Sequence, residues 1–392
     1  MRMFRGNLRV EGQQYRRTRW LQRQRDKRKE SVARMRGLNQ GPAEAEVGKR
    51  DNARGESAQT KKDRGREKRE RQQIYFCSML QIPEWMVEIP SDLGPENWMV
   101  CARPEGQRCL VISQGGRTIS RKKNGAVMKT FDSLLPSGCG GRGHGESTIL
   151  ECVFHEADQT YYVLDILQWK GFNYCDSTAE FRFYWMQSKL AEIEGICSVS
   201  DHNQYRFQPI PMFKCDRTGL ESVYTSTYQY QKDGLVFYNK DGHYVGGLTP
   251  LVLSWKDSAT SRYPIDTPDG INPYPVQMCV LRFDEANPTL LRAVGGDVVS
   301  IVDFSSLRGA HDLKPGGCAR FIVRSPVTSS HDKNFMTSPE DSLTVHIFIS
   351  SLEFHSKCKS WKQPDSSCRI AFQYAMRTAP LTIQKIGHSI TG

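Results

Sequence analysis

The pattern of polar and apolar positions divides the chain into a polar N-terminal fifth and a body of short apolar runs. From Tyr15 to Arg36 the residues are mostly good helix formers (Arg, Gln, Lys, Met and Ala), and Gly37 favours a helix end there. The apolar positions in this run are too few to bury one helix face in the protein's own core. We therefore predict a helix over residues 15–36 that becomes ordered when an acidic surface encloses it.

Residues 39–73 have no apolar periodicity and hold Gly, Ala, Ser, Gln and dense mixed charges. This composition is typical of a flexible linker, because such a segment cannot bury enough apolar surface to offset the entropy of ordering it. We expect a basic linker over residues 39–75.

The pattern changes to strand-like runs from Phe76 onward. Thr148–Phe154 and Thr160–Leu167 flank a short polar turn, which predicts a hairpin. The aromatic-rich run Glu180–Leu190 indicates a helix, or a strand leading into one. Further strands are predicted at Cys109–Ser113, Leu235–Asn239 and Leu251–Trp255. The pattern predicts an α+β domain built around antiparallel strands.

Residues 257–392 contain strand-like runs, such as Met278–Phe283 and Leu343–Ile349, between stretches rich in Pro, Gly and Ser. We find no motif in this region. Its fold and its role stay open at the level of sequence.

Charge is distributed very unevenly along the 392 residues, whose net charge is +11. Residues 1–73 hold 23 Lys and Arg against 10 Asp and Glu, a net charge of +13, and the remainder carries −2. This split indicates an electrostatic arm rather than a uniformly basic surface. The arginine-rich start lacks a secretory signal pattern, and no run approaches the about 20 apolar residues that span a bilayer. We expect a soluble intracellular protein.

The twelve cysteines include no CxxC pair, and we interpret them as buried thiols rather than a disulfide framework. The pattern nearest to metal spacing is His355-x-x-Cys358 with Cys368 beyond it. Structural zinc sites use four well-spaced ligands, so this pattern is a weak alternative. We expect neither a metal nor another cofactor.

Two basic clusters flank Leu21 in the polar N-terminal run, and a spaced basic end follows them. This arrangement resembles the importin-β-binding helix of nuclear import adaptors. A long basic helix suits the acidic inner face of a superhelical repeat receptor. Charge alone favours a nonspecific RNA-binding arm or a solvated tail, whereas the spacing of the clusters and the runs that follow favour the receptor-binding helix. The residues that the resemblance implies for receptor binding are Arg16, Arg17, Arg19, Leu21, Arg23, Arg25, Lys27, Arg28, Arg34 and Arg36.

Six longer runs, in the same order along the chain, resemble the cap-binding domain of the snurportin family. They are Trp85–Gly94, Phe131–Pro136, Gln159–Asp165, Phe181–Met186, Asp233–Tyr238 and Thr249–Val252. The resemblance covers Tyr15–Leu38 and about residues 76–256. It implies a domain similar in fold to the nucleotidyltransferase domain of mRNA capping enzymes and DNA ligases. The expected division is 1–38 importin-β-binding segment, 39–75 linker, 76–256 cap-binding domain and 257–392 unassigned extension.

The resemblance also implies a cap site. The family holds a trimethylguanosine cap with two tryptophans, and these correspond to Trp85 and Trp255 here. A lysine of the family contacts the cap phosphates, and it corresponds to Lys123. A 7-methylated purine is cationic, so an indole face offers it both stacking and cation–π attraction. Pro83 and Arg103 stand where the family has serine and cysteine. The other lining residues implied are Ile82, Pro83, Arg103, Gln107, Arg108 and Cys109.

The resemblance therefore implies a nuclear import adaptor that is not an enzyme. It would carry spliceosomal small nuclear RNPs with trimethylguanosine-capped RNA to importin-β, return with an exportin, and shuttle between cytoplasm and nucleus. The run Arg103–Arg108 lies where capping enzymes and ligases have K-x-D-G-x-R, and arginine cannot replace their nucleophilic lysine because its guanidinium stays protonated. The alternatives are an mRNA capping guanylyltransferase or ligase-like nucleotidyltransferase, and a generic RNA-binding protein with a basic arm.

Overall fold

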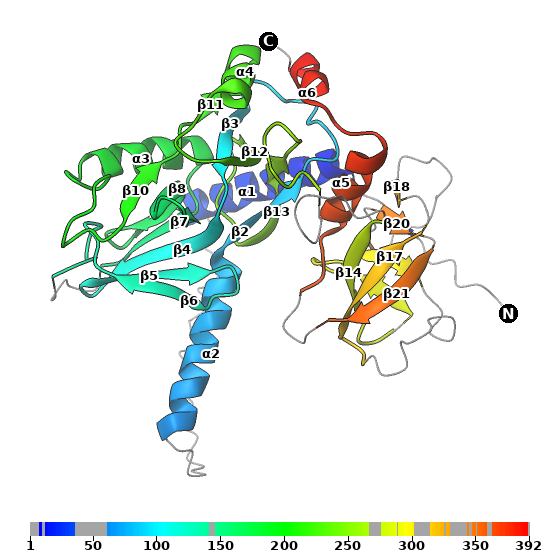
Figure 1. The fold of residues 1–392 in the computed structure, drawn as a ribbon, viewed down its shortest axis with the longest axis horizontal. Coiled ribbons are helices and arrows are strands. Elements are labelled where there is room, and N and C mark those ends of the chain that lie inside the picture. Colours follow the sequence, from blue (N-terminus) through cyan, green and yellow to red (C-terminus); the bar gives the residue numbers. More distant parts are fainter. Residues whose placement is uncertain are drawn as a thin grey trace.

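A computed structural model gives the arrangement of the chain in three parts (Figure 1). Two N-terminal helices adjoin a central body of two sheets, and a separate C-terminal sheet lies beside that body, followed by two short helices. None of the helices in the described part of the chain is long and apolar enough to cross a membrane. The structure describes residues 8–9, 12–35, 61–140, 146–265, 276–287, 289–301, 314–324, 327–329, 343–344, 347–349, 351–358 and 363–390.

The larger sheet of the central body has the order β10-β8-β7-β4-β5-β6, with β9 paired to β8. All of its pairs are antiparallel except β10 with β8. Its strands are β4 (Gln107–Gln114), β5 (Arg117–Lys122), β6 (Val127–Phe131), β7 (Thr148–His155), β8 (Thr160–Trp169), β9 (Phe172–Asn173) and β10 (Arg206–Pro209).

The second central sheet has the order β11-β3-β12-β13-β2, and β2 pairs with β13 in parallel at its edge. One hydrophobic core unites the two sheets, with large buried side chains such as Trp98, Tyr161 and Phe237. The strands of this sheet are β2 (Gln81–Trp85), β3 (Trp98–Pro104), β11 (Phe213–Lys214), β12 (Lys232–Asn239) and β13 (Gly247–Trp255).

The predicted α+β class and the predicted strands of the central body are confirmed. Strands β7 and β8 form the expected antiparallel hairpin, and β12 pairs antiparallel with β13. The aromatic-rich run is a helix, α3 (Ala179–Ala191), which begins after the N-cap Thr178, whose side chain accepts a hydrogen bond from the Phe181 N–H. Helix α4 (Arg217–Thr225) begins in the same way after Asp216.

The N-terminal part agrees with the sequence-based expectation in its first helix and differs in the segment after it. Helix α1 (Gln13–Met35) confirms the predicted helix. Residues 61–79 form a second helix, α2 (Lys61–Met79), where we expected a linker as far as residue 75. The helix forms because its Lys, Arg, Glu and Gln residues are good helix formers. Its apolar end also packs beside the β5–β6 turn, where the Phe76 ring centroid lies 4.4 Å from the Arg121 guanidinium. The α2 helix projects away from the body (Figure 1); residues 36–60 lie outside the described residues.

The C-terminal region forms a five-stranded antiparallel sheet of order β16-β15-β14-β17-β21 with its own core, which includes Leu281, Phe283 and Phe321. The predicted strand at 278–283 is confirmed, and the run 343–349 contains two short strands rather than one. The elements are β14 (Met278–Phe283), β15 (Leu290–Arg292), β16 (Val298–Ile301), β17 (Cys318–Val323), β21 (Leu352–Lys357), the pair β18 (Val327–Ser329) and β20 (Ile347–Ile349), and β19 (Leu343–Thr344), which pairs with β1 (Leu8–Arg9).

Helices α5 (Ser367–Thr378) and α6 (Ile383–Ser389) end the described chain and join the C-terminal sheet to the central body. Ile370 of α5 belongs to the core of the C-terminal sheet, whereas Phe372 of the same helix and Ile386 of α6 belong to the central core. The segment from α5 to α6 therefore packs into both hydrophobic cores.

The stability of the central body depends on a buried ion pair between Arg182 of α3 and Asp165 of β8, whose side chains are each 1% exposed and 2.8 Å apart. Changing Asp165→Leu would leave the guanidinium buried without its carboxylate, and we expect it to lower the free energy of unfolding by about 3–5 kcal/mol. The matched change Glu192→Leu breaks the more exposed Lys189–Glu192 pair and should cost less than about 1 kcal/mol. Urea denaturation of both variants checks this, and equal losses would contradict it.

Candidate functional site

The two tryptophans implied for cap binding lie on neighbouring strands at the edge of the second sheet. Strands β2 and β13 are parallel, and their register places Ser254 beside Trp85. The Met86 N–H continues this pairing by donating to the Ser254 carbonyl at 2.9 Å. Because successive side chains of a strand point to opposite faces, Trp255 projects from the face opposite to Trp85. The structure therefore does not place the two indole rings face to face as two walls of one slot.

Trp85 is half-buried and has an aromatic and a cationic neighbour. The Phe372 ring of α5 lies 4.7 Å from the Trp85 ring at an interplanar angle of 32°. The Lys256 ammonium lies 5.5 Å from the Trp85 ring centroid, within cation–π range. The backbone N–H of Trp85 donates to the Cys368 sulfur at 3.4 Å. These neighbours of Trp85 thus come from the residue after β13 and from helix α5.

Trp255 is only 1% exposed and belongs to the central core. Its indole Nε1–H donates to the carbonyl of Leu381, in the connection between α5 and α6, at 2.8 Å. The Tyr224 ring of α4 lies 6.4 Å away. The C-terminal segment therefore contacts both tryptophans, a relationship that no local pattern in the sequence indicates.

A charged cluster centred on Asp233 lies beside Trp85. The Asp233 carboxylate pairs with Arg103 of β3 and lies 3.6 Å from the Lys256 ammonium. It also accepts a hydrogen bond from the Ser261 hydroxyl at 2.7 Å. Arg103, one of the predicted cap-lining residues, is thus held by a carboxylate. The sequence shows Asp233 only as the first residue of a longer matching run, and its meeting with Arg103 depends on the pairing of β3 with β12.

The predicted residues of strand β4 point mainly into the protein. Arg108 pairs with the buried Glu151, whose other oxygen accepts a hydrogen bond from the Tyr244 hydroxyl at 2.5 Å. Burial raises the pKa of Glu151, and Arg108 opposes that shift. Cys109 is fully buried, and burial raises the pKa of its thiol. Of the three predicted residues, only Gln107 is exposed, so Arg108 and Cys109 lie in the interior rather than on an open surface.

Three further predicted residues lie on β2 or directly after β5. Ile82 and Pro83 precede Trp85 on β2 and are half-buried. Lys123 follows β5, and desolvation lowers its pKa, with the positive charges of Arg108 and Arg369 lowering it further. Of these two arginines, Arg108 is paired with Glu151, and Arg369 is paired with Asp365 at 3.2 Å.

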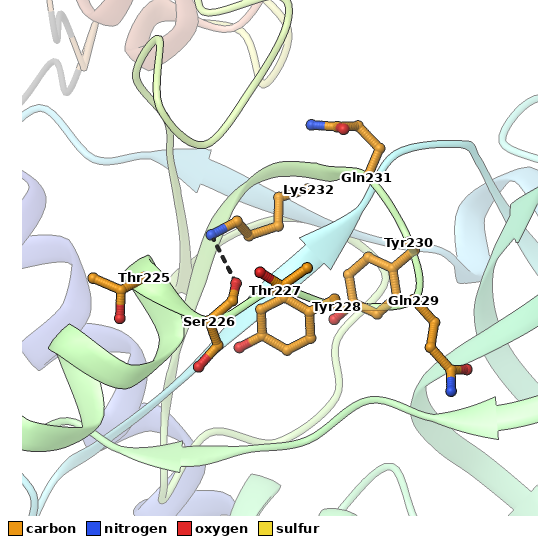
Figure 2. A pocket seen from close by; sticks show the side chains of 8 residues that line it. All are labelled: Thr225, Ser226, Thr227, Tyr228, Gln229, Tyr230, Gln231 and Lys232. Carbon is orange, nitrogen blue, oxygen red and sulfur yellow. Dashed lines mark hydrogen bonds between the residues drawn. The ribbon is translucent and has the colours of Figure 1, made fainter.

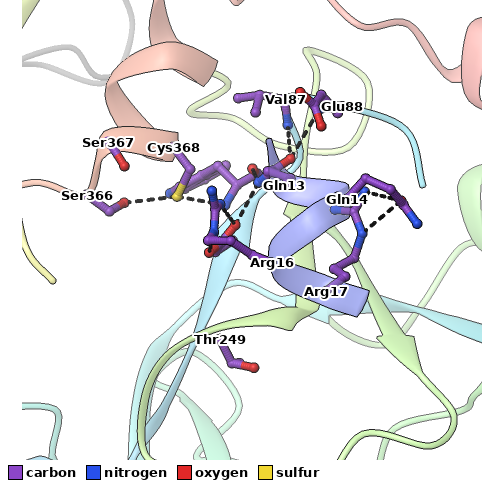
Figure 3. Close-up of polar contacts among 12 residues, drawn as sticks. Gln13, Gln14, Arg16, Arg17, Val87, Glu88, Thr249, Ser366, Ser367 and Cys368 are labelled. Atoms are coloured by element: carbon purple, nitrogen blue, oxygen red, sulfur yellow. Dashed lines mark hydrogen bonds and ion pairs between the residues drawn. The ribbon is translucent and has the colours of Figure 1, made fainter. Parts of the chain in front are cut away.

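The first turns of α1 dock on β2 at Glu84, the residue before Trp85. Figure 3 shows Gln13 of α1 beside Val87 and Glu88, which follow this strand. Glu84 is 3% exposed, and its carboxylate accepts hydrogen bonds from Gln13 at 2.9 Å and from Arg16 at 2.6 Å. The Gln13 amide also donates to the Trp85 carbonyl at 2.8 Å and accepts from the N–H groups of Val87 and Glu88, each at 3.1 Å. Our expectation that the protein's own body would not order this helix was wrong, because the contacts are polar rather than apolar.

The basic residues of α1 fall into a docked set and an exposed set. Arg16 and Arg17 lie against the body, and burial lowers the pKa of Arg17 to about 10. Leu21 is half-buried. Arg34 lies within α1, but its side chain is outside the described residues. Arg36 is outside the described residues altogether. The exposed residues are Arg19, Arg23, Arg25, Lys27 and Arg28.

A pocket of about 360 Å³ lies elsewhere, in the segment Thr225–Lys232 between α4 and β12 (Figure 2). The Lys232 ammonium donates there to the carbonyls of Tyr224 at 2.5 Å and Ser226 at 3.2 Å. The Tyr228 and Tyr230 rings stack with centroids 5.1 Å apart. None of the predicted cap-binding residues lines this pocket.

The weak zinc alternative finds no support in the described part of the chain, where no three His, Cys, Asp or Glu side chains form a metal-binding group. His355 is exposed, with its Nδ1 3.0 Å from the Ser356 hydroxyl. Cys368 instead lies against the Trp85 backbone and 3.2 Å from the Ser366 hydroxyl. Burial raises the pKa of the Cys368 thiol to about 12.

Comparisons with known proteins place this geometry in context. Among solved structures, a mycobacterial DNA ligase D complexed with ATP and MES shares 9% identity at a TM-score of 0.34, over 74% of this chain and 97% of that one. The ATP-dependent DNA ligase from bacteriophage T7 shares 11% identity at a TM-score of 0.34, over 73% and 100%. A protein-family model described as "Snurportin1, m3G cap-binding domain" matches residues 79–257, the span from the end of α2 to just beyond Lys256. Residues 79–257 of this chain therefore belong to the snurportin family of m3G cap-binding domains.

Proposed function

We propose that this protein is a nuclear import adaptor that binds the trimethylguanosine cap of small nuclear RNAs at Trp85 and presents α1 to an importin-β receptor. The match of residues 79–257 to the m3G cap-binding domain carries the proposal. The exposed basic half of α1 supports the second part, because it offers a cationic helix to an acidic receptor.

Trp85 and its neighbours suit a cationic base followed by an anionic phosphate chain. The indole face that attracts the Lys256 ammonium would also attract a 7-methylated guanine by stacking and cation–π interaction. The cap phosphates would then be contacted by Lys123, which lies within the electrostatic influence of Arg108 and Arg369. Lys256 would exchange its contact with the ring for one with a phosphate oxygen.

The chemistry at Arg103 favours binding over catalysis. A nucleotidyltransferase needs a deprotonated lysine amine to attack the α-phosphate. The Arg103 guanidinium is paired with Asp233, and a guanidinium is a hydrogen-bond donor that cannot take the place of that amine. We therefore propose that the domain holds the cap without forming a covalent adduct.

The arrangement of α1 gives the arm two different halves. Its inner end is held by Glu84, while the ion pairs of the outer half with Asp241 and Asp176 are long, at 3.4 and 3.9 Å, and solvent-exposed. Exposed pairs of this kind contribute little. A receptor would therefore engage the outer half first and compete with Glu84 for Arg16.

Replacing Trp85 with Ala should weaken binding of a trimethylguanosine cap analogue tenfold or more, because a base–aromatic stack contributes about 1–3 kcal/mol. Fluorescence titration of the purified protein measures this. Trp185→Ala, a change on the partly exposed α3, is the matched control and should leave the affinity unchanged. Trp255→Phe is the suitable change at the second tryptophan, since Ala would leave a cavity in the core. Equal affinity of Trp85→Ala and the wild type would remove Trp85 from the site.

Deleting residues 1–38 should abolish binding to an importin-β receptor and leave the affinity for the cap analogue within about twofold. Receptor binding by the full chain should weaken steeply with salt, because many Lys and Arg contacts are screened together. Surface plasmon resonance at several salt concentrations measures both effects.

A pair of charge-removing variants tests the competition between Glu84 and the receptor. Glu84→Gln weakens the buried contact with Arg16 and should tighten receptor binding several-fold, whereas Asp241→Asn removes only an exposed pair and should not change it.

The adaptor assignment would be wrong if deleting residues 1–38 removed RNA affinity and spared receptor binding.

A further inference from the structure

Helix α5 contacts Trp85 at two points, although it lies outside the span 79–257 that matches the family. The Phe372 ring lies 4.7 Å from the Trp85 ring. One helical turn earlier, the Cys368 sulfur accepts the Trp85 N–H at 3.4 Å. Residues four apart lie on the same face of a helix, so one face of α5 contacts both the side chain and the backbone of Trp85.

The other contacts of α5 fix the helix in place. The Ser367 hydroxyl donates to the Asp297 carboxylate at 2.7 Å, and the Gln277 amide donates to the Ile370 carbonyl at 2.8 Å. Ile370 lies in the core of the C-terminal sheet, whereas Phe372 lies in the central core. Because α5 is anchored in both cores, the groups that it presents to the indole are held in one position.

Phe372 and Trp85 differ in their exposure to solvent. Phe372 is 1% exposed, whereas Trp85 is half-buried and keeps part of its surface open. A buried ring thus backs a partly open one. An indole supported in this way keeps one orientation, and a ligand that stacks on it does not have to order it first.

We propose that Phe372 and Cys368 are positioning residues of the cap site, which hold the Trp85 indole in the orientation on which the methylated guanine stacks. This role rests on the proposed cap-binding function, and it gives residues 257–392 a part in that function. The C-terminal sheet supports α5, and α5 supports Trp85. A region without a recognisable motif therefore contributes to the affinity of the site through the side chain that it orients.

The test compares two variants of the full chain that make the same change in the same core. Phe372→Leu keeps a buried apolar side chain and removes the ring behind Trp85. Phe183→Leu, on α3, is the matched control, because Phe183 is 3% exposed and its ring lies 4.9 Å from the Tyr238 ring. In titrations with a trimethylguanosine cap analogue, Phe372→Leu should weaken binding about three- to tenfold, in keeping with the energy of an aromatic pair, and Phe183→Leu should not change it. Equal affinities of the two variants would overturn the positioning role.

A double-mutant cycle separates positioning from a general effect on the fold. If Phe372 acts through Trp85, Phe372→Leu should cause no further loss of cap affinity in a Trp85→Ala background. A loss of the same size in both backgrounds would show that the ring supports the fold and not the indole, and the positioning role would be wrong.

Hydrogen exchange on the unmodified protein provides a measurement that does not depend on a variant's folding. A base stacked on Trp85 stabilises the indole against Phe372, so the cap analogue should slow backbone exchange in α5, residues 367–378. Unchanged or faster exchange of α5 in the bound protein would contradict the proposed support.

The outcomes separate the positioning role from the function on which it rests. If the wild type binds the cap analogue and Phe372→Leu binds it equally well, the cap-binding proposal stands and the positioning role falls. If the wild type does not bind the analogue, the proposed function itself fails.

Discussion

The buried carboxylate of Glu84, on edge strand β2, is the interaction on which the arrangement of the N-terminal arm depends. A carboxylate that is 3% exposed requires partners, because burying an unpaired charge is very unfavourable. Gln13 and Arg16 of α1 supply them, and Gln13 also bonds the backbone of the next residues. Trp85, adjacent to Glu84, contacts α5. One short strand therefore connects the basic arm, the candidate cap site and the C-terminal segment.

This connection has a functional consequence for the proposed adaptor. An adaptor must hold its cargo and its receptor at the same time, and here the residues suggested for the two tasks are neighbours on one strand. Glu84 and Trp85 are consecutive residues of β2, so the two proposed contacts meet on one strand without sharing a side chain.

The C-terminal region adds a second packed unit to the m3G cap-binding domain. Its five-stranded sheet has its own core, yet α5 places Ile370 in that core and Phe372 in the central one. A helix that contributes to two cores ties the position of one sheet to the tryptophans of the other. This gives residues 257–392, which carry no recognisable motif, a physical relationship to the candidate site.

Local patterns in the sequence determined the elements of this protein, and long-range packing decided how they meet. Helix-forming residues fixed α1, and runs of apolar residues fixed strands such as β7 and β8, because helix and strand periodicity depend on neighbours in the chain. The cap-binding domain was indicated differently, by the resemblance of six runs to a known family. The docking of α1 on Glu84, the burial of Trp255 and the contact of Phe372 with Trp85 join residues from about 70 to nearly 290 positions apart. Only the tertiary structure could decide these, since no local periodicity records which distant partner satisfies a buried charge or covers an indole ring.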